Sequence, residues 1–290
     1  MHWLTTRFRI ELTRPHVMGI VNVTPDSFFD GGRHGDTNSA SALCDALLAD
    51  GADILDIGGE STRPGARATT LEEEVARVMP VLRHAVTLGV PVSVDTSRPE
   101  VMRAALDLGV DIVNDVRALR REGSLACLAS HPRAGLCLMH MRGEPGTMQV
   151  NSSYQDVVRE VVDFLQSRVD AARAAGVAED RIVVDPGIGF AKTAAHNVEL
   201  LCRQQELLAV GQPLLVGWSR KSTLGVIIGR PVGDRLAASV AAALAAAQRG
   251  ASVLRVHDVA ATVDALKVWR SAASGRIPTP DNDIRRGPSP

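Results

Sequence analysis

The chain has 290 residues, of which 45% are apolar and 22% charged, proportions that are ordinary for a globular protein with a large core. Its 32 basic and 33 acidic side chains nearly cancel, which argues against a general binder of nucleic acids or membrane surfaces. We expect neither a signal peptide nor a membrane span, because no apolar stretch approaches the ~20 residues that a spanning helix needs.

Short aliphatic or β-branched runs recur along the whole chain, and six of them follow a glycine that is typical of a helix end. The runs are continuous rather than alternating, which predicts parallel strands covered by helices. The intervening helices are expected to begin at capping boxes over residues 70–73 and 97–100. In chain order, the predicted strands cover residues 16–23, 52–58, 90–96, 110–116, 136–141, 181–187, 212–219 and 251–258.

Strand and helix alternate eight times without a linker-like break in composition, which predicts an α/β fold: a (β/α)8 TIM barrel in a single domain over residues 1–273. The tail over residues 274–290 is rich in Pro, Arg and Asp and is predicted to be disordered. The main rival is a doubly wound open sheet. That fold usually has G-x-G-x-x-G after its first strand, and residues 22–32 lack this spacing.

The four cysteines are Cys44, Cys127, Cys137 and Cys202, and no two of them form a C-x-x-C pair. Their wide separation argues against a disulfide framework or a zinc site. We expect reduced, mostly buried thiols, as in a cytoplasmic protein.

Polar side chains stand at the carboxyl end of nearly every predicted strand, where barrel enzymes place their chemistry. A single one would be read as a capping or turn residue, but recurrence at the same end favours a site. Because side chains alternate along a strand, Asn114 is expected to point inward and Asp115 to have a structural role. The set comprises Asn22, Asp56, Asp95, Asn114, His140, Asp185, Ser219 with Lys221, and Arg255 with His257.

The mixture of charges in this set predicts the kind of ligand. Carboxylates accept hydrogen bonds from an amino or amidine-like edge, whereas Arg, Lys and His suit phosphate oxygens. A heterocycle that carries phosphate fits both. Two long loops, over residues 24–32 and 59–65, flank these strand ends. The adjacent Phe28 and Phe29 suggest a closing lid, because the chain has only 3% aromatic residues.

From His16 to about Trp269, the chain resembles a known family, the dihydropteroate synthases of folate biosynthesis. The resemblance implies a transferase that joins 6-hydroxymethyl-7,8-dihydropterin diphosphate to 4-aminobenzoate, with Mg2+ as cofactor. It also implies a homodimer and a target of sulfonamides. The motifs that carry the resemblance are HVMGIVNVTPDSFFDGG, DILDIGGESTRPGA, SVDTSRPEV, IVNDV, LMHMRG, DPGIGFAKTAAHN, GWSRKS and RVHDV.

Carried over position by position, the resemblance assigns the pterin's pyrimidine edge to Asp95, Asn114 and Asp185. Lys221 would reach the pterin ring and the neighbouring aminobenzoate site. Arg255 would stack on the pterin face and also contact phosphate.

The remaining roles concern diphosphate and aminobenzoate. Asn22 would help to hold Mg2+ and diphosphate, and His257 and Arg63 would bind diphosphate oxygens. Asp56 would support the pterin pocket. Lys221, Arg255 and Arg63 are the expected catalytic residues. The aminobenzoate pocket would be shaped by Thr62, Pro64, Phe28, Phe190 and Ser222.

The expected reaction is SN1-like, because the dihydropterin ring can delocalise positive charge as diphosphate leaves. Two alternatives are compatible with a pterin-binding barrel. A methyltetrahydrofolate–corrinoid methyltransferase would share the pterin pocket but would not need the two long loops. A paralogue that binds pterin without turnover would be expected to lose phosphate-binding residues, yet Arg63, Lys221, Arg255 and His257 are all present. The Ala-rich helix over residues 236–247 could face a partner subunit or simply be an outer helix of the barrel.

Overall fold

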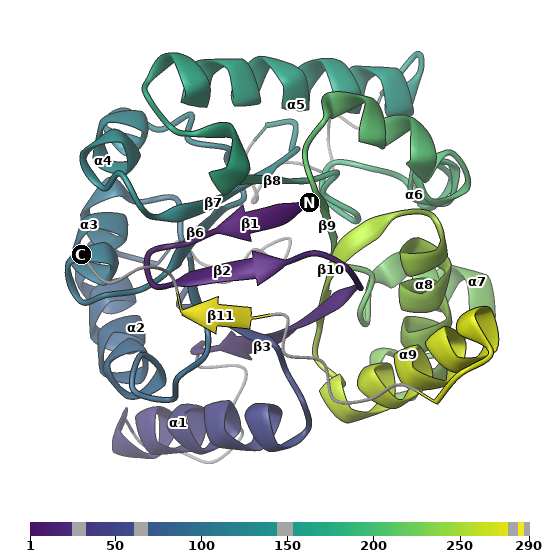
Figure 1. Cartoon of the computed structure of the whole chain (residues 1–290), viewed down its shortest axis with the longest axis horizontal. Helices are drawn as coiled ribbons and strands as arrows, with labels where there is room; N and C mark the ends of the chain where they lie inside the picture. Colours follow the sequence, from purple (N-terminus) through teal and green to yellow (C-terminus); the bar gives the residue numbers. More distant parts are fainter. Residues whose placement is uncertain (25–32, 61–68, 144–152, 278–283, 287–290) are drawn as a thin grey trace.

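The computed structural model describes residues 1–24, 33–60, 69–143, 153–277 and 284–286. Within these ranges, eight parallel strands close into a barrel in the order β10-β3-β4-β5-β6-β7-β8-β9. This is the (β/α)8 barrel that the sequence predicted (Figure 1). The strands are β3 His16–Asn22, β4 Ile54–Gly58, β5 Val92–Asp95, β6 Ile112–Asp115, β7 Gly135–Met139, β8 Ile182–Asp185, β9 Leu214–Val216 and β10 Ala251–Val256.

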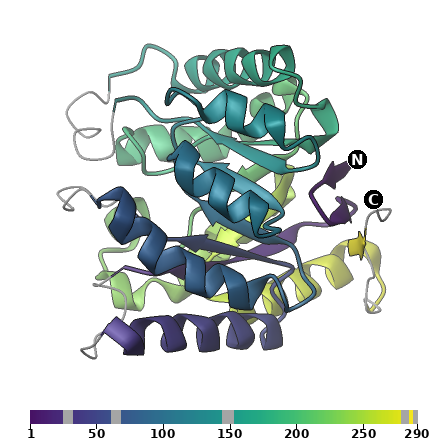
Figure 2. The same cartoon turned by 90° about the vertical axis from the view of Figure 1, so that its left-hand side faces the viewer.

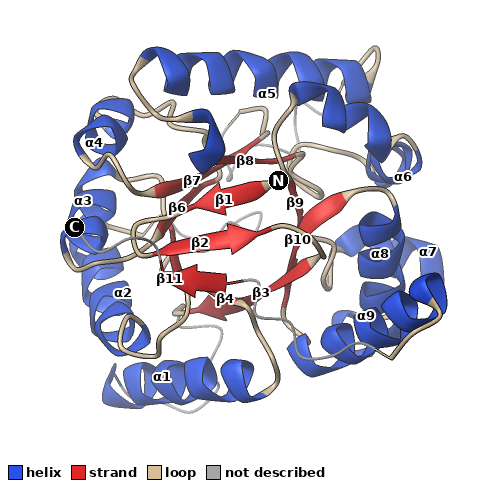
Figure 3. Ribbon diagram, viewed as in Figure 1, coloured by secondary structure: helices blue, strands red, loops and turns tan. Residues whose placement is uncertain are grey.

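Helices surround the barrel and cover the outer face of its strands, as the blue ring around the red strands shows (Figure 3). Outward side chains such as Val17, Leu55 and Val94 are buried in one large apolar core that includes helical residues. The helices are α1 Arg33–Ala49, α2 Leu71–Ala85, α3 Pro99–Asp107, α4 Ser124–Ser130, α5 Val157–Ala174, α6 Ala194–Cys202, α7 Ser222–Ile228, α8 Leu236–Gln248 and α9 Val259–Ser274.

The barrel interior has an apolar floor under a polar layer, and the two-residue repeat of a strand produces both. Ile54, Ile112, Val183 and Val253 belong to one buried cluster inside the barrel. The residues two positions later on the same strands are Asp56, Asn114, Asp185 and Arg255. Because side chains two apart share a face, these polar groups also point inward, at the carboxyl end.

A small antiparallel sheet closes the opposite, amino-terminal end of the barrel. Strands β1 (His2–Leu4) and β2 (Phe8–Glu11) form a hairpin that the sequence analysis did not predict. Their side chains Trp3, Phe8 and Ile10 join the apolar cluster inside the barrel. The indole Nε1 of Trp3 donates to the carbonyl of Arg181 at 3.0 Å, just before β8.

The third strand of this small sheet corrects a prediction. Residues 284–286 were expected to belong to a disordered tail, but they form β11 (Ile284–Arg286), which pairs with β2. Ile284 packs against the same cluster as Trp3. The hairpin and β11 therefore lie together at one end of the barrel (Figure 2). Residues 278–283 and 287–290 of the expected tail lie outside the described residues.

One of the two predicted capping boxes is confirmed. Thr70 accepts from the backbone N–H of Glu73, and the Glu73 side chain accepts from the N–H of Thr70. The box predicted over residues 97–100 is wrong. The N-cap of α3 is Arg98, whose side chain makes no capping hydrogen bond to the helix. The Ser97 hydroxyl donates to the buried carboxylate of Asp115 instead of capping the helix.

The cysteines follow the expectation for thiols. Cys44, Cys127 and Cys137 are buried, Cys202 is exposed, and all four are free. Among the described residues, no helix combines the length and the apolar character that crossing a bilayer would require.

Candidate active site

Two strand-end carboxylates accept hydrogen bonds from the guanidinium of Arg255 inside the barrel. Its Nε donates to Asp56 Oδ2 at 2.6 Å, and its Nη2 donates to Asp95 Oδ2 at 2.8 Å. Asn114 Nδ2 donates to the same Asp56 oxygen at 3.2 Å. The four residues come from β10, β4, β5 and β6, so the closed barrel brings together positions up to 199 residues apart.

Two atoms of this cluster are left without a hydrogen-bond partner among the described residues. Asp56 is fully buried, yet its Oδ1 has no hydrogen-bond partner in the described part of the chain. Arg255 Nη1 likewise has no partner among the described residues. These atoms lie at the carboxyl end, where a ligand would complete their hydrogen bonds.

The charges in the cluster shift one another. Burial raises the pKa of Asp95 to about 7, against the lowering effect of Arg255. Burial alone would lower the pKa of Arg255, but Asp56 and Asp95 raise it above its usual value. Arg255 is therefore a fixed cation, whereas Asp95 changes charge near neutral pH.

A second group of side chains comes from β8 and the loops after β8 and β9. Asp185 Oδ1 accepts the backbone N–H of Gly187 at 2.7 Å, and burial raises the pKa of Asp185. Lys221 Nζ lies 4.2 Å from the ring centroid of Phe190, an attractive cation–π contact. Burial, with Arg255 nearby, lowers the pKa of Lys221 to about 8. This group joins an anion, a cation and an aromatic face.

His257 and Ser219 form a hydrogen-bonded pair on the side of the site where phosphate is expected to bind. Ser219 Oγ lies 3.0 Å from His257 Nδ1 and also accepts the backbone N–H of His257 at 3.1 Å. The hydroxyl hydrogen is therefore free to point at Nδ1, which leaves Nε2 as the N–H donor. Burial and the nearby Arg220 lower the pKa of His257 to about 3. Arg220 itself turns outward to Asp258, at 2.6 Å.

The two adjacent residues at the end of β6 point in opposite directions, as expected. Asn114 faces Asp56 inside the barrel. Asp115 accepts the backbone N–H groups of Arg117 and Leu119, at 2.8 and 2.7 Å, and the Ser97 hydroxyl. Asp115 thus organises the turn after β6.

The other predicted residues divide into two groups. Asn22 ends β3 beside Gly58 of β4, Phe190 is buried, and Ser222 begins α7. The side chain of His140 does not point into the barrel. Met139 lies two residues after the inward-facing Cys137, so His140 points the other way. The Nδ1 of His140 lies 2.8 Å from Lys192 Nζ. Outside the described residues lie Phe28, Thr62, Arg63 and Pro64.

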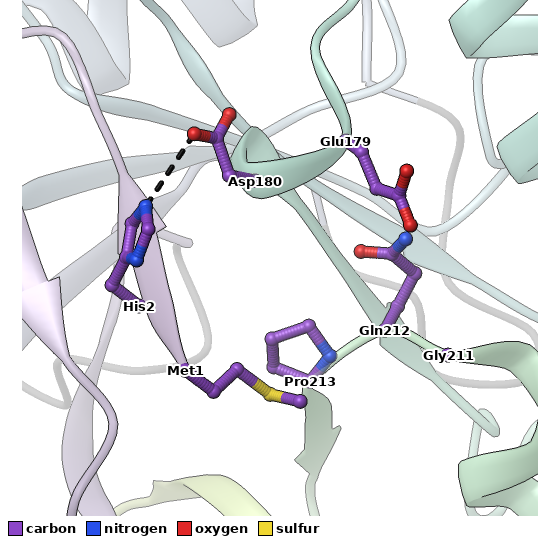
Figure 4. A pocket seen from close by; sticks show the side chains of 7 residues that line it. All are labelled: Met1, His2, Glu179, Asp180, Gly211, Gln212 and Pro213. Atoms are coloured by element: carbon purple, nitrogen blue, oxygen red, sulfur yellow. Dashed lines mark hydrogen bonds and ion pairs between the residues drawn. The ribbon is translucent and has the colours of Figure 1, made fainter.

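Two cavities lie outside the cluster around Arg255, and the first of them includes His140. A hollow of about 380 Å³ lies beside the end of β7 and includes Arg120, Arg142 and Phe164. A hollow of about 510 Å³ lies at the amino-terminal end of the barrel, where Figure 4 shows His2 pointing toward Asp180. It is lined by Met1, His2, Glu179, Asp180, Gly211, Gln212 and Pro213.

Residues 18–257 match the model of a family described as pterin binding enzyme. The dihydropteroate synthase of Neisseria meningitidis serogroup B is 53% identical over 275 residues, which is 93% of this chain and 96% of that protein. The solved structure of Xanthomonas albilineans dihydropteroate synthase with 4-aminobenzoic acid is 49% identical, with a TM-score of 0.87, and covers 93% of this chain and 99% of that one. A structure of the X. albilineans enzyme in complex with 7,8-dihydropteroate is 48% identical, with a TM-score of 0.84, over 92% of this chain and 96% of that one.

The raised pKa of Asp95 predicts a pH-dependent stability in the ligand-free protein. The folded value of about 7 exceeds the ~3.9 of an unfolded aspartate, so the folded state holds more protons between these values. The contribution of Asp95 to the free energy of unfolding should therefore fall as pH rises from ~4 to 7. Urea unfolding should be measured for the parent and for Asp95→Asn from pH 5 to 8. The free energy of unfolding of the parent, relative to that of the variant, should fall as the pH rises. A constant difference would contradict the assignment, and Asp264→Asn, at an exposed site on α9, is the control.

Proposed function

The chain belongs to the dihydropteroate synthase family of pterin-binding enzymes, and we propose that it joins 6-hydroxymethyl-7,8-dihydropterin diphosphate to 4-aminobenzoate and releases diphosphate. The observation that carries this proposal is the arrangement of charges in the barrel. The acceptors are the buried Asp56 and Asp185 and the partly buried Asp95, and the donors are Lys221 and His257. A pterin and its diphosphate need such a division.

The buried carboxylates suit the amino and ring N–H groups of the pterin. Asp185 uses Oδ1 for the loop and keeps Oδ2 without a partner among the described residues. Asn114 donates to Asp56 with its Nδ2 and so turns its own oxygen to other donors. Since a buried apolar cluster lies below these groups, each unmatched hydrogen bond would be costly. The pocket therefore favours a ring with complementary edges.

We assign the departure of diphosphate to the donors at the rim. Arg255 is held as a cation with Nη1 open, and neutral His257 offers its Nε2 hydrogen. Arg63 would add a further cation. Neutralising the leaving group lets the C–O bond break first, because the dihydropterin ring delocalises the positive charge. The aromatic amine is neutral near pH 7 and attacks without a strong base.

Mg2+ would add positive charge between the diphosphate oxygens, which Arg and His alone neutralise incompletely. Asn22, at the carboxyl end of β3, fits as one oxygen ligand. Among the described residues no cluster of three His, Cys, Asp or Glu is arranged to hold a metal. We therefore propose that diphosphate supplies other ligands.

For 4-aminobenzoate, we propose the space beside Phe190, Lys221 and Ser222. The Phe190 ring offers an apolar face with the Lys221 ammonium beside it, and Ser222, next to Lys221 at the start of α7, would add a hydroxyl. The Xanthomonas structure with 4-aminobenzoic acid supports an aminobenzoate site in the family. Phe28, Thr62 and Pro64 would complete this pocket.

The first prediction tests the function and the pterin site together. Purified protein should form 7,8-dihydropteroate from the two substrates. Asp185→Asn replaces an acceptor with a group that also donates, a mismatch of on the order of 1–3 kcal/mol, so KM for the pterin substrate should rise at least tenfold. Asp180→Asn, at the other end of β8, should behave like the parent. An unchanged KM in folded Asp185→Asn would refute the role of Asp185.

The second prediction concerns the metal. Because diphosphate should contribute ligands, calorimetry should show Mg2+ binding much more tightly in the presence of diphosphate than in its absence. Chelation of Mg2+ should slow turnover. Equal affinity for Mg2+ with and without diphosphate would argue for a site built by protein groups alone.

We further propose that the protein is a homodimer. Apolar side chains are exposed together on α7, the turn after it and the start of α8: Val226 is 71% exposed, Ile227 59%, Val232 57% and Leu236 48%. Such a patch is typical of a protein interface.

The free thiols suit a reducing compartment, and we propose the cytoplasm.

The prediction for the dimer is a charge effect on this patch. Ile227→Asp would bury a carboxylate in the interface, so sedimentation equilibrium at micromolar protein should shift the variant to the mass of one chain. Ser167→Asp on α5, an exposed position elsewhere, should sediment like the parent. A parent protein that sediments as a single chain would rule out the homodimer.

A further inference from the structure

We propose that Lys192 is a positioning residue for the reaction: its ammonium group fixes the loop between β8 and α6 so that Asp185 and Phe190 face the substrates. The inference rests on the proposed function of the site. Lys192 itself lies outside the strand ends and was not predicted from the sequence.

Lys192 is buried, and its amino group lies within hydrogen-bonding distance of three polar atoms. Its Nζ lies 2.8 Å from His140 Nδ1, 3.0 Å from the carbonyl oxygen of Gly187 and 3.1 Å from that of Phe190. None of these three is a carboxylate, and only 3% of the residue is exposed. Burial lowers the pKa of Lys192 to about 7. The charge of Asp185 opposes this lowering, but no carboxylate accepts a hydrogen bond from the ammonium, so burying it is costly.

One effect reaches Asp185. Gly187 gives its carbonyl oxygen to Lys192 and its N–H to Asp185 Oδ1, at 2.7 Å. Gly187 has a φ of +67°, and a Cβ here would lie 1.9 Å from the carbonyl oxygen of His140. His140 in turn donates its backbone N–H to the carbonyl of Asp185 at 2.8 Å. Lys192 therefore closes a ring of bonds that orients the Asp185 carboxylate.

The other effect reaches Phe190. The residue between Phe190 and Lys192 is Ala191, whose φ is +50°, a left-handed conformation that is unfavourable for a side chain with a Cβ. This bend lets Lys192 reach back to the Phe190 carbonyl. With its backbone held, the Phe190 ring keeps its place 4.2 Å from Lys221 Nζ. Strain at a loop of this kind persists only where surrounding contacts enforce it.

These two effects predict how the reaction would change without the ammonium. Lys192 is not placed to touch either substrate, so its loss should act through Asp185 and Phe190. Pterin binding depends on the first and aminobenzoate binding on the second. The KM values for both substrates should therefore rise together, while kcat, measured at saturating substrate, should change less.

The experiment uses Lys192→Met, which keeps the length of the side chain and removes its donors. We expect KM for both substrates to rise at least tenfold and kcat to fall less than threefold, with the folded fraction measured by circular dichroism. Lys267→Met removes an exposed lysine on α9 and should match the parent. If Lys192→Met lowers only the folded fraction and leaves both KM values unchanged, Lys192 is merely structural and the proposal fails.

A second pair of variants decides the matter if Lys192→Met does not fold. His140→Leu removes one acceptor of the ammonium, whereas His140→Gln keeps one. A rise in both KM values for Leu, restored to within about twofold by Gln, supports the proposal, and equal values for the two variants overturn it. A parent protein without turnover would refute the proposed function, and the role of Lys192 with it. Unchanged variants of an active parent would refute only the role of Lys192.

Discussion

The guanidinium of Arg255 can remain charged inside the barrel only because two carboxylates from other strands accept its hydrogen bonds. A lone buried cation would be strongly destabilising, and removing one partner of such a group leaves an uncompensated charge. Asp56 and Asp95 therefore have to stand beside β10 in the folded chain. This requirement links β4, β5 and β10, and it keeps one guanidinium nitrogen open at the mouth of the barrel.

The same constraint explains why the site occupies one layer of the barrel. Below Asp56 and Arg255, the inward side chains Ile54 and Val253 belong to a buried apolar cluster, so that side offers these charges no hydrogen-bond partner. Above them the strands end. The polar layer therefore lies between an apolar floor and the loops. Its free hydrogen-bonding groups can meet only a ligand that enters from the loop side. The low effective dielectric strengthens each of those bonds.

Regular features of the fold could be predicted from the sequence because they depend on local periodicity. The strand runs predicted the barrel, and the repeat of two along β6 correctly separated inward Asn114 from structural Asp115. Features that depend on partners distant in sequence were missed. Ser97 has the spacing of a helix cap, yet its hydroxyl bonds Asp115 across the fold. Lys192 likewise carries no periodic signal, since its partners lie in the loop after β8 and at His140, just after β7.

The small sheet at the amino-terminal end of the barrel has a consequence for how the chain can be joined to other molecules. Because β1 and β11 both pair with β2, the first residues and residues 284–286 leave the barrel on the face opposite the polar layer. A fused domain, an affinity tag or a surface linker attached at either end would extend away from the mouth of the barrel. Substrates could then still reach the strand ends in an immobilised protein. Trp3 and Ile10 fill the barrel floor, however, so such an attachment has to precede the hairpin rather than replace it.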